Sequence, residues 1–159
     1  IPICKKKGFD KEERPNAQSW GITYGNTRNI PPGAAEINAS NLQTLELDWA
    51  FAFPDAQRAR SHPLIAGGVL FTGSQNGTVY ALDAATGCML WSFEARAEVR
   101  TGIVISPWDE KNKLNPQIFF GDLVGNIYAM DAITGGLNWQ IHPEGHPAAT
   151  ITGTPTTMS

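Results

Sequence analysis

The fold is decided by two related stretches of sequence, Gly73–Trp91 (GSQNGTVYALDAATGCMLW) and Gly121–Trp139 (GDLVGNIYAMDAITGGLNW). Nine of their 19 positions are identical, and every matched pair is separated by 48 residues. A constant offset in the range of about 20 to 50 residues is typical of solenoids and propellers, in which each repeat is one supersecondary unit. The 159 residues are therefore expected to form a series of repeats rather than one undivided domain.

Each repeat has the pattern of short β-strands joined by tight turns. The predicted strands cover residues 64–65, 69–71, 78–82 and 89–93 in the first repeat, and 101–105, 117–120, 126–130 and 137–141 in the second. Asn76-Gly77 lies between two of these runs, and both residue types tolerate the positive φ that a two-residue hairpin turn requires. Four antiparallel strands in a repeat of this length predict an all-β fold built from propeller blades.

The rest of the chain is divided around these repeats. We expect an N-terminal lead-in segment over 1–44 and an incomplete β-propeller over 45–159, with a strand at 45–53, blades at 60–93 and 100–141, and the start of a next blade at 150–159. The best helical candidate is Ala35–Leu45, where Asn38 or Ser40 could cap a short turn. Because a propeller needs about four to eight blades to close, we expect a slice of a longer domain that folds poorly alone.

Composition excludes several classes of protein. Twelve Lys and Arg residues against 15 Asp and Glu residues give a net charge of −3. This charge does not indicate a nucleic-acid-binding protein, which typically carries a broad basic surface. No apolar run approaches the length of a transmembrane helix. His142 and His146 have metal-ligand spacing only on a helix, whereas Pro143 and Gly145 predict a loop.

The cysteines and one inserted loop give weaker signals. Cys4 and Cys88 belong to no Cys-x-x-Cys motif, which excludes a zinc ribbon or a covalent haem site within the chain. We interpret them as two unrelated thiols, with a disulfide between them as the open alternative. The loop 106–116 holds Trp108 and four charged residues, so it is expected on the surface.

The repeated residues form the pattern Ala-x-Asp-x-x-Thr-Gly-x-x-x-Trp, found at Ala81–Trp91 and Ala129–Trp139. Its aspartate is expected to accept backbone N–H bonds at a turn, and its glycine to supply a permissive backbone. Its tryptophan offers a large face to the neighbouring blade and an indole N–H donor. We therefore interpret these tryptophans as contacts between blades, not as substrate contacts.

This pattern resembles the tryptophan-docking motif of the quinoprotein propellers, whose enzymes bind pyrroloquinoline quinone (PQQ). The segments 20–28, 37–42 and 45–51 are similar to the N-terminal region of quinoprotein alcohol dehydrogenases. The segments 49–63, 86–88 and 97–102 are similar to polyvinyl-alcohol-dehydrogenase-like proteins. The resemblance covers about residues 19–155 and implies the N-terminal part of a PQQ-type propeller with about eight blades.

The resemblance also implies an activity. It implies a PQQ-dependent alcohol dehydrogenase that oxidises alcohols or polyalcohols to ketones or aldehydes by hydride transfer to PQQ, with cytochrome c as electron acceptor. In that family Ca²⁺ polarises the reactive carbonyl and an aspartate removes the alcohol proton. No carboxylate in this sequence matches those residues, so we name no catalytic residue and no metal ligand, and we expect the Ca²⁺ ligands outside this span and the span itself to be inactive. A periplasmic or secreted location is implied in the same way.

Candidate cofactor contacts follow from the innermost strand of each blade. Aligned on that strand, Arg60, Arg100 and Thr152 occupy the same place in successive blades, and Thr101 follows Arg100. Guanidinium groups bind carboxylates bidentately, and PQQ carries three carboxylates. By the resemblance we assign Arg60, Arg100, Thr101 and Thr152 as candidate PQQ contacts. Methanol-oxidising members differ here, with an acidic residue at the place of Arg60 and adjacent cysteines near Arg100-Thr101. The alternative is that these arginines are solvated residues of a blade rim.

A second function is compatible with the same repeat. Non-catalytic propellers, such as the periplasmic scaffold that helps insert outer-membrane proteins, keep the tryptophan motif. They need neither the inward arginines nor the lead-in between Trp20 and Trp49. A third option is another enzyme or binding protein built on this repeat.

Overall fold

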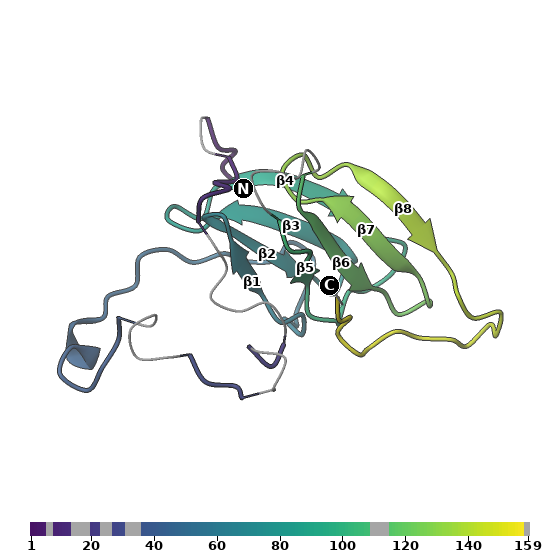
Figure 1. Ribbon diagram of the computed structural model, residues 1–159, viewed down its shortest axis with the longest axis horizontal. Coiled ribbons are helices and arrows are strands. Elements are labelled where there is room, and N and C mark those ends of the chain that lie inside the picture. Colours follow the sequence, from purple (N-terminus) through teal and green to yellow (C-terminus); the bar gives the residue numbers. More distant parts are fainter. Residues whose placement is uncertain (6–7, 14–19, 23–26, 31–35, 109–114, 158–159) are drawn as a thin grey trace.

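The strands of the described chain form two four-stranded antiparallel sheets. The computed structural model describes residues 1–5, 8–13, 20–22, 27–30, 36–108 and 115–157. Blade one contains β1 (Leu64–Ala66), β2 (Val69–Gly73), β3 (Thr78–Asp83) and β4 (Met89–Glu94). Blade two contains β5 (Val104–Ile105), β6 (Gln117–Gly121), β7 (Ile127–Asp131) and β8 (Leu137–Ile141). In both sheets the strands pair in chain order (Figure 1), so the predicted all-β fold with four-stranded blades is confirmed.

The sequence repeat is also a repeat of strand register. Val69 pairs with Asp83 in blade one, and Gln117 pairs with Asp131 in blade two. The third and fourth strands of each blade carry a register shift at the same place, after Ala81 in blade one and after the equivalent alanine in blade two. The hairpin turn of blade one covers residues 74–77, and in it only Gly77 has a positive φ, of 89°, so the predicted two-residue Asn-Gly turn is wrong.

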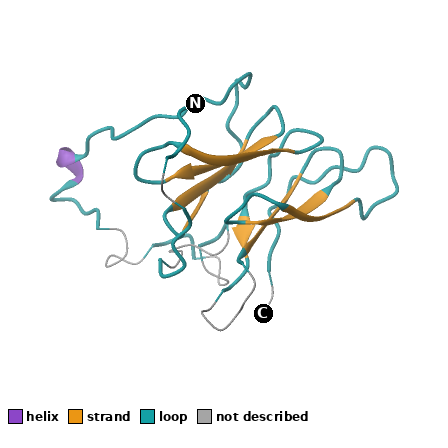
Figure 2. Ribbon diagram, turned by 90° about the horizontal axis from the view of Figure 1, so that it is seen from above, coloured by secondary structure: helices purple, strands orange, loops and turns teal. Residues whose placement is uncertain are grey.

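The hydrophobic core lies between the two sheets, which lie side by side in both views (Figure 2). Its largest fully buried members come from both blades and include Phe71, Ile118, Phe120, Tyr128 and Met130. Phe93 of β4 reaches across from blade one, with its ring centroid 5.7 Å from that of Tyr128. Because large aromatic side chains bury much apolar surface, this shared core stabilises the two blades against each other.

Several predicted strand ends are wrong. Residues 45–53 run extended but pair with no strand of the described chain. The innermost strand of blade two starts at Val104 and not at the expected Thr101, because the Thr101 hydroxyl accepts the backbone N–H of Gly121. A ladder cannot form where side chains occupy its donors. Residues 150–157 likewise form no strand.

The helical candidate shrinks to a single turn. A 3-10 helix covers only Leu42–Thr44, on the long loop that lies away from both sheets (Figure 2). Asn38 does not cap it, since its side-chain oxygen accepts the backbone N–H of Ser40 at 2.9 Å. Residues 31–35 of this region lie outside the described residues.

The cysteines form a disulfide, so the interpretation as unrelated thiols is wrong. Residues 2–4 lie parallel to β4, where Met89 N–H donates to the Pro2 carbonyl at 2.8 Å and Cys4 N–H donates to the Met89 carbonyl at 3.0 Å. Cys4 and Cys88 are then bonded across a sequence separation of 84 residues. This disulfide forms because residues 2–4 lie beside β4, and no local sequence pattern predicts that contact.

The described residues between 2 and 13 form what we call the N-terminal clasp. Phe9 packs between Phe71 of β2 and Trp108, with ring centroids 6.5 Å and 5.3 Å away. The Trp108 indole N–H donates to the Lys11 carbonyl at 2.9 Å. Trp108 is 9% exposed, so its expected surface position is wrong, because the clasp covers it. Residues 109–114 of the same loop lie outside the described residues.

Candidate functional site

Trp49 and Trp91 each dock onto the blade that follows them in the chain. The Trp49 indole N–H donates to the Ala84 carbonyl at 3.0 Å, and the Trp91 indole N–H donates to the Ala132 carbonyl at 3.2 Å. A methyl group on Gly87 would lie 2.6 Å from the Trp49 ring, and one on Gly135 would lie 2.6 Å from the Trp91 ring. The motif glycines therefore let an indole lie flat on the turn, which confirms that Trp91 makes a contact between blades.

A second repeated contact sets the inner ends of the blades. The Ser61 hydroxyl accepts the Gly73 N–H at 3.1 Å, and the Thr101 hydroxyl accepts the Gly121 N–H at 3.0 Å. The Ser61 hydroxyl also donates to the Thr101 carbonyl at 2.8 Å. Residues 61 and 101 are thus structural equivalents, and so are the arginines that precede them.

The third predicted position follows the same register. The Val99 N–H donates to the Ser74 carbonyl, and the Ile151 N–H donates to the Asp122 carbonyl, each at 3.1 Å. Val99 and Ile151 therefore hold the same place in successive repeats, and the residues after them, Arg100 and Thr152, are equivalent as well. The spacing argument placed these residues correctly relative to one another.

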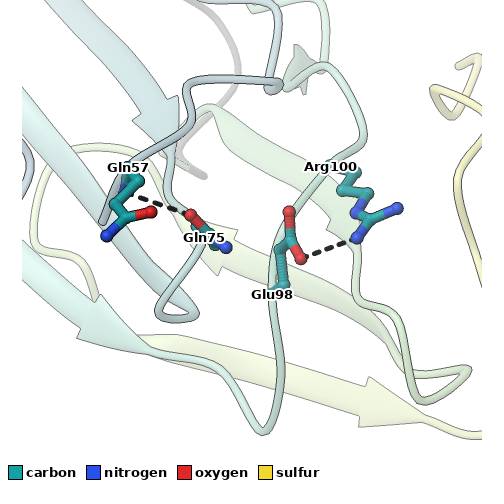
Figure 3. A network of polar contacts seen from close by, with 4 residues as sticks. All are labelled: Gln57, Gln75, Glu98 and Arg100. Carbon is teal, nitrogen blue, oxygen red and sulfur yellow. Dashed lines mark hydrogen bonds and ion pairs between the residues drawn. The ribbon is translucent and has the colours of Figure 1, made fainter. Parts of the chain in front are cut away.

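Two of the predicted arginines act on one glutamate. Arg100 donates from Nη2 to Oε2 of Glu98 at 2.9 Å, and Figure 3 shows the two side chains pointing toward each other. The Glu98 side chain is 13% exposed and that of Arg100 is 30% exposed. This hydrogen bond lowers the pKa of Glu98 against the opposing effect of burial, and the positive charges of Arg100, Arg60 and Arg58 lower it further. The same bond raises the pKa of Arg100.

Arg58 and Arg60 act on the Glu98 carboxylate through their charges, and of the three arginines, all in the described chain, only Arg100 bonds to it. We call these four residues the rim cluster: Arg58, Arg60, Glu98 and Arg100. In this cluster Arg100 bonds to Glu98, and the charges of Arg58 and Arg60 act on the same carboxylate. An exposed group of this kind attracts anions with several acidic groups.

The segment that carries Arg58 and Arg60 is held on the hairpin turn of blade one. The Gln57 N–H donates to the side-chain oxygen of Gln75 at 3.1 Å (Figure 3). The Asn76 side-chain amide donates to the Pro54 carbonyl at 3.1 Å. These bonds join the otherwise unpaired segment to the same end of the sheet as Arg100.

The predicted contacts differ in what they offer a ligand. Arg60 and Thr152 are exposed, and Arg100 is half-buried. Thr101 is fully buried and its hydroxyl also donates to the Gly121 carbonyl at 3.3 Å. Thr101 therefore faces the protein, and its observed role is to hold Arg100 at the start of blade two.

Sequence reasoning missed Arg58 and Glu98. Each lies two positions before a predicted arginine, and alternate residues of an extended chain face the same side. This spacing of two residues could have identified both residues from the sequence.

A separate cavity of about 510 Å³ lies at the other end of blade one, between the clasp and the β1–β2 turn. Its lining includes Asp10, Glu13 and Asp83. Within the described part of the chain, no three His, Cys, Asp or Glu side chains are grouped so that they could hold a metal ion. No helix in the described ranges is long and apolar enough to cross a membrane.

Comparison with known proteins gives one family. The model of the β-propeller domain of glucose, ethanol and alcohol dehydrogenases, designated PQQ, matches residues 18–147. A polyvinylalcohol dehydrogenase of a Pseudomonas species is 32% identical over 158 residues, which is 98% of this chain and 24% of that protein. A quinohemoprotein alcohol dehydrogenase of Comamonas testosteroni is 26% identical over 88 residues, 55% of this chain and 12% of that protein.

Solved structures agree on the fold. The quinohemoprotein alcohol dehydrogenase ADHIIG of Pseudomonas putida HK5 superimposes with a TM-score of 0.72 at 25% identity, over 89% of this chain and 22% of that chain. A europium-containing methanol dehydrogenase superimposes with a TM-score of 0.66 at 26% identity, over 89% of this chain and 26% of that chain. The chain thus spans about a quarter of the length of the polyvinylalcohol dehydrogenase it matches.

Proposed function

The chain belongs to the β-propeller family of PQQ-type glucose, ethanol and alcohol dehydrogenases, and on that premise we propose that it forms two adjacent blades of a PQQ-dependent alcohol dehydrogenase. The observation that carries the proposal is the rim cluster. Arg60 and Arg100 hold equivalent positions in two successive repeats, Arg100 bonds to Glu98, and the charge of Arg60 acts on the same glutamate.

The chemistry of the cluster fits the cofactor. PQQ is a flat quinone with three carboxylates, and a guanidinium fork binds a carboxylate through two parallel hydrogen bonds. Three arginines against one glutamate leave a surplus of two positive charges in the rim cluster. We propose that Arg60 and Arg100 bind carboxylates of PQQ, that the exposed Thr152 hydroxyl adds a hydrogen bond, and that Thr101 acts only by fixing the backbone of Arg100.

When bound, PQQ supplies a hydride acceptor for the oxidation of an alcohol. The residues of these two blades bind and orient it, while the tryptophan contacts keep the two inner ends in register. We propose that the Ca²⁺ ligands and the catalytic base come from other repeats of the enzyme. The described residues hold no group suited to a metal ion.

Substrate, acceptor and location are further parts of the proposal. The similarity to a polyvinylalcohol dehydrogenase supports a polymeric or secondary alcohol as substrate. A lupanine 17-hydroxylase named for cytochrome c is 32% identical over 76 residues, which supports cytochrome c as the electron acceptor. A periplasmic or secreted location accords with this electron acceptor and with the Cys4–Cys88 disulfide.

Reconstitution tests the proposal. The full-length enzyme proposed to contain these two blades is incubated with PQQ and Ca²⁺, and alcohol-dependent reduction of a dye is measured with polyvinyl alcohol, 2-propanol and ethanol. The expected result is PQQ-dependent turnover, and the variants Arg60→Ala and Arg100→Ala should weaken PQQ binding. Arg96→Ala is the matched control, because it removes an exposed arginine outside the rim cluster. Failure to take up PQQ would replace this proposal with the non-catalytic scaffold.

A further inference from the structure

Arg100 is held in an unusual way for a half-exposed arginine. Its Nε atom is buried and has no hydrogen-bond partner, the one such side-chain nitrogen or oxygen among the described residues. A buried donor without a partner is unfavourable and calls for an explanation. The guanidinium is fixed instead through Nη2, by the bond to Glu98 at 2.9 Å.

Glu98 is itself fixed between the two blades. Its backbone carbonyl accepts the N–H of Leu123, in the β6–β7 turn of blade two, at 3.0 Å. The next residue, Val99, donates its N–H to the Ser74 carbonyl in blade one at 3.1 Å. Hydrogen bonds to both blades therefore fix the backbone at Glu98, and the Glu98 side chain contacts Arg100 from this fixed position.

We propose that Glu98 is a positioning residue for the cofactor: it orients Arg100 so that the other guanidinium nitrogens face the ligand carboxylate. This inference rests on the proposed PQQ site. Glu98 was not among the residues assigned by resemblance. Its single negative charge leaves two of the three positive charges of the rim cluster uncompensated for an anionic ligand.

The effect of removing Glu98 separates positioning from simple electrostatics. Glu98→Ala deletes a negative charge beside an anion site, and by charge alone it would tighten the binding of PQQ. If Glu98 positions Arg100, the same variant weakens binding by about five- to tenfold. Glu98→Gln keeps an acceptor in place and should retain binding within about threefold. Glu94→Ala is the matched control, since it removes an exposed glutamate at the end of β4.

Two readouts test this on the same proteins. PQQ affinity is measured by fluorescence titration, and the side-chain N–H signals of Arg100 are followed by ¹⁵N NMR without ligand. We expect restricted Nη rotation in the wild type, Glu98→Gln and Glu94→Ala, and free rotation in Glu98→Ala. Unchanged rotation or undiminished PQQ affinity in Glu98→Ala would overturn the inference.

These measurements distinguish failure of the proposed PQQ site from failure of the proposed role of Glu98. If Arg100→Ala weakens PQQ binding and Glu98→Ala does not, the cofactor site stands and the role of Glu98 is wrong. If the wild type binds no PQQ, the proposed function fails and the role of Glu98 toward that cofactor fails with it. A thermal melt of each variant confirms that the fold is intact before either result is interpreted.

Discussion

The two blades receive the same indole contact from different kinds of donor. In blade two the donor is Trp91, which belongs to β4 and therefore to a complete four-stranded sheet. In blade one the donor is Trp49, on an extended segment that pairs with no described strand. The indole contact needs only a tryptophan on an extended segment opposite a motif glycine. Docking therefore does not require that the tryptophan belong to a complete four-stranded blade.

The blades also differ in the surroundings of their equivalent tyrosines, Tyr80 in blade one and Tyr128 in blade two. Tyr128 of blade two donates its hydroxyl to the buried Asp122 carboxylate at 2.7 Å and accepts the Arg96 N–H at 3.0 Å. In blade one Ser74 stands in the place of Asp122, and Tyr80 is covered by Phe51, with ring centroids 5.1 Å apart. Blade two is thus fixed by a buried polar network where blade one relies on aromatic packing.

The largest expected effect on stability comes from removing Trp91, whose indole joins the two complete sheets. Trp91→Ala should lower the free energy of unfolding by about 3–5 kcal/mol, because it opens a cavity between blades and removes the bond to Ala132. Trp49→Ala should cost about 1–3 kcal/mol, since the segment can detach while blade one keeps its strands. Urea denaturation measures both, and an equal or larger loss for Trp49→Ala would refute the difference between the two interfaces.

The clasp is the next largest contribution, and it acts on blade one. The double variant Cys4→Ser with Cys88→Ser should lose about 2–4 kcal/mol, because the disulfide closes a long loop. Under a reducing agent the wild type should fall to the stability of the variant. A variant as stable as the oxidised protein would show that the hydrogen bonds of residues 2–4 hold the clasp without the disulfide.

The polar network predicts a smaller contrast between the blades. Tyr128→Phe should cost about 1–3 kcal/mol, because the Arg96 N–H loses its acceptor inside the protein. Tyr80→Phe should cost less than about 1 kcal/mol, since no hydrogen bond of its hydroxyl is found among the described residues. Equal losses, measured by urea denaturation, would mean that Asp122 contributes nothing specific to blade two.

Alkaline pH should weaken blade two through the same tyrosine. Burial, with the bond to Asp122, raises the pKa of Tyr128 from its ordinary value of 10.0 to about 12. The folded state therefore holds its proton more tightly than the unfolded state, so this stability is present below pH 10 and is lost as the pH rises toward 12. A melting profile over pH 9–12 should flatten in Tyr128→Phe and stay unchanged in Tyr80→Phe.

The smallest effect is expected at the uncovered face of blade two. Trp139 is 41% exposed, and its nearest aromatic neighbour is Phe119 at 6.0 Å between ring centroids. Trp139→Ala should therefore change the stability of the 159-residue chain by no more than about 0.5 kcal/mol. A loss as large as that of Trp91→Ala would show that this face is already covered.

The repeat predicted most of the fold and part of the site. The contact of Trp91 with the neighbouring blade could be predicted from the sequence because its tryptophan recurs with the repeat itself. Likewise, the equivalence of Arg60 and Arg100 followed from counting along matched strands. These features depend on spacing, which a sequence displays directly.

The remaining features depend on contacts between distant segments. Cys4 meets Cys88 only because residues 2–4 run beside β4. Trp108 is buried because the clasp supplies the Lys11 carbonyl and the Phe9 ring. Thr101 is fully buried and bonds to the backbone of Gly121, a contact that residue type alone does not reveal.

Hydrogen exchange of the five indole N–H groups, followed by ¹⁵N NMR in the 159-residue chain, tests the shared docking contact most directly. We predict slow exchange for Trp49 and Trp91, whose N–H groups donate to Ala84 and Ala132, and fast exchange for Trp139 on its exposed face. Exchange of Trp49 or Trp91 at the rate of Trp139 would contradict the two-blade arrangement.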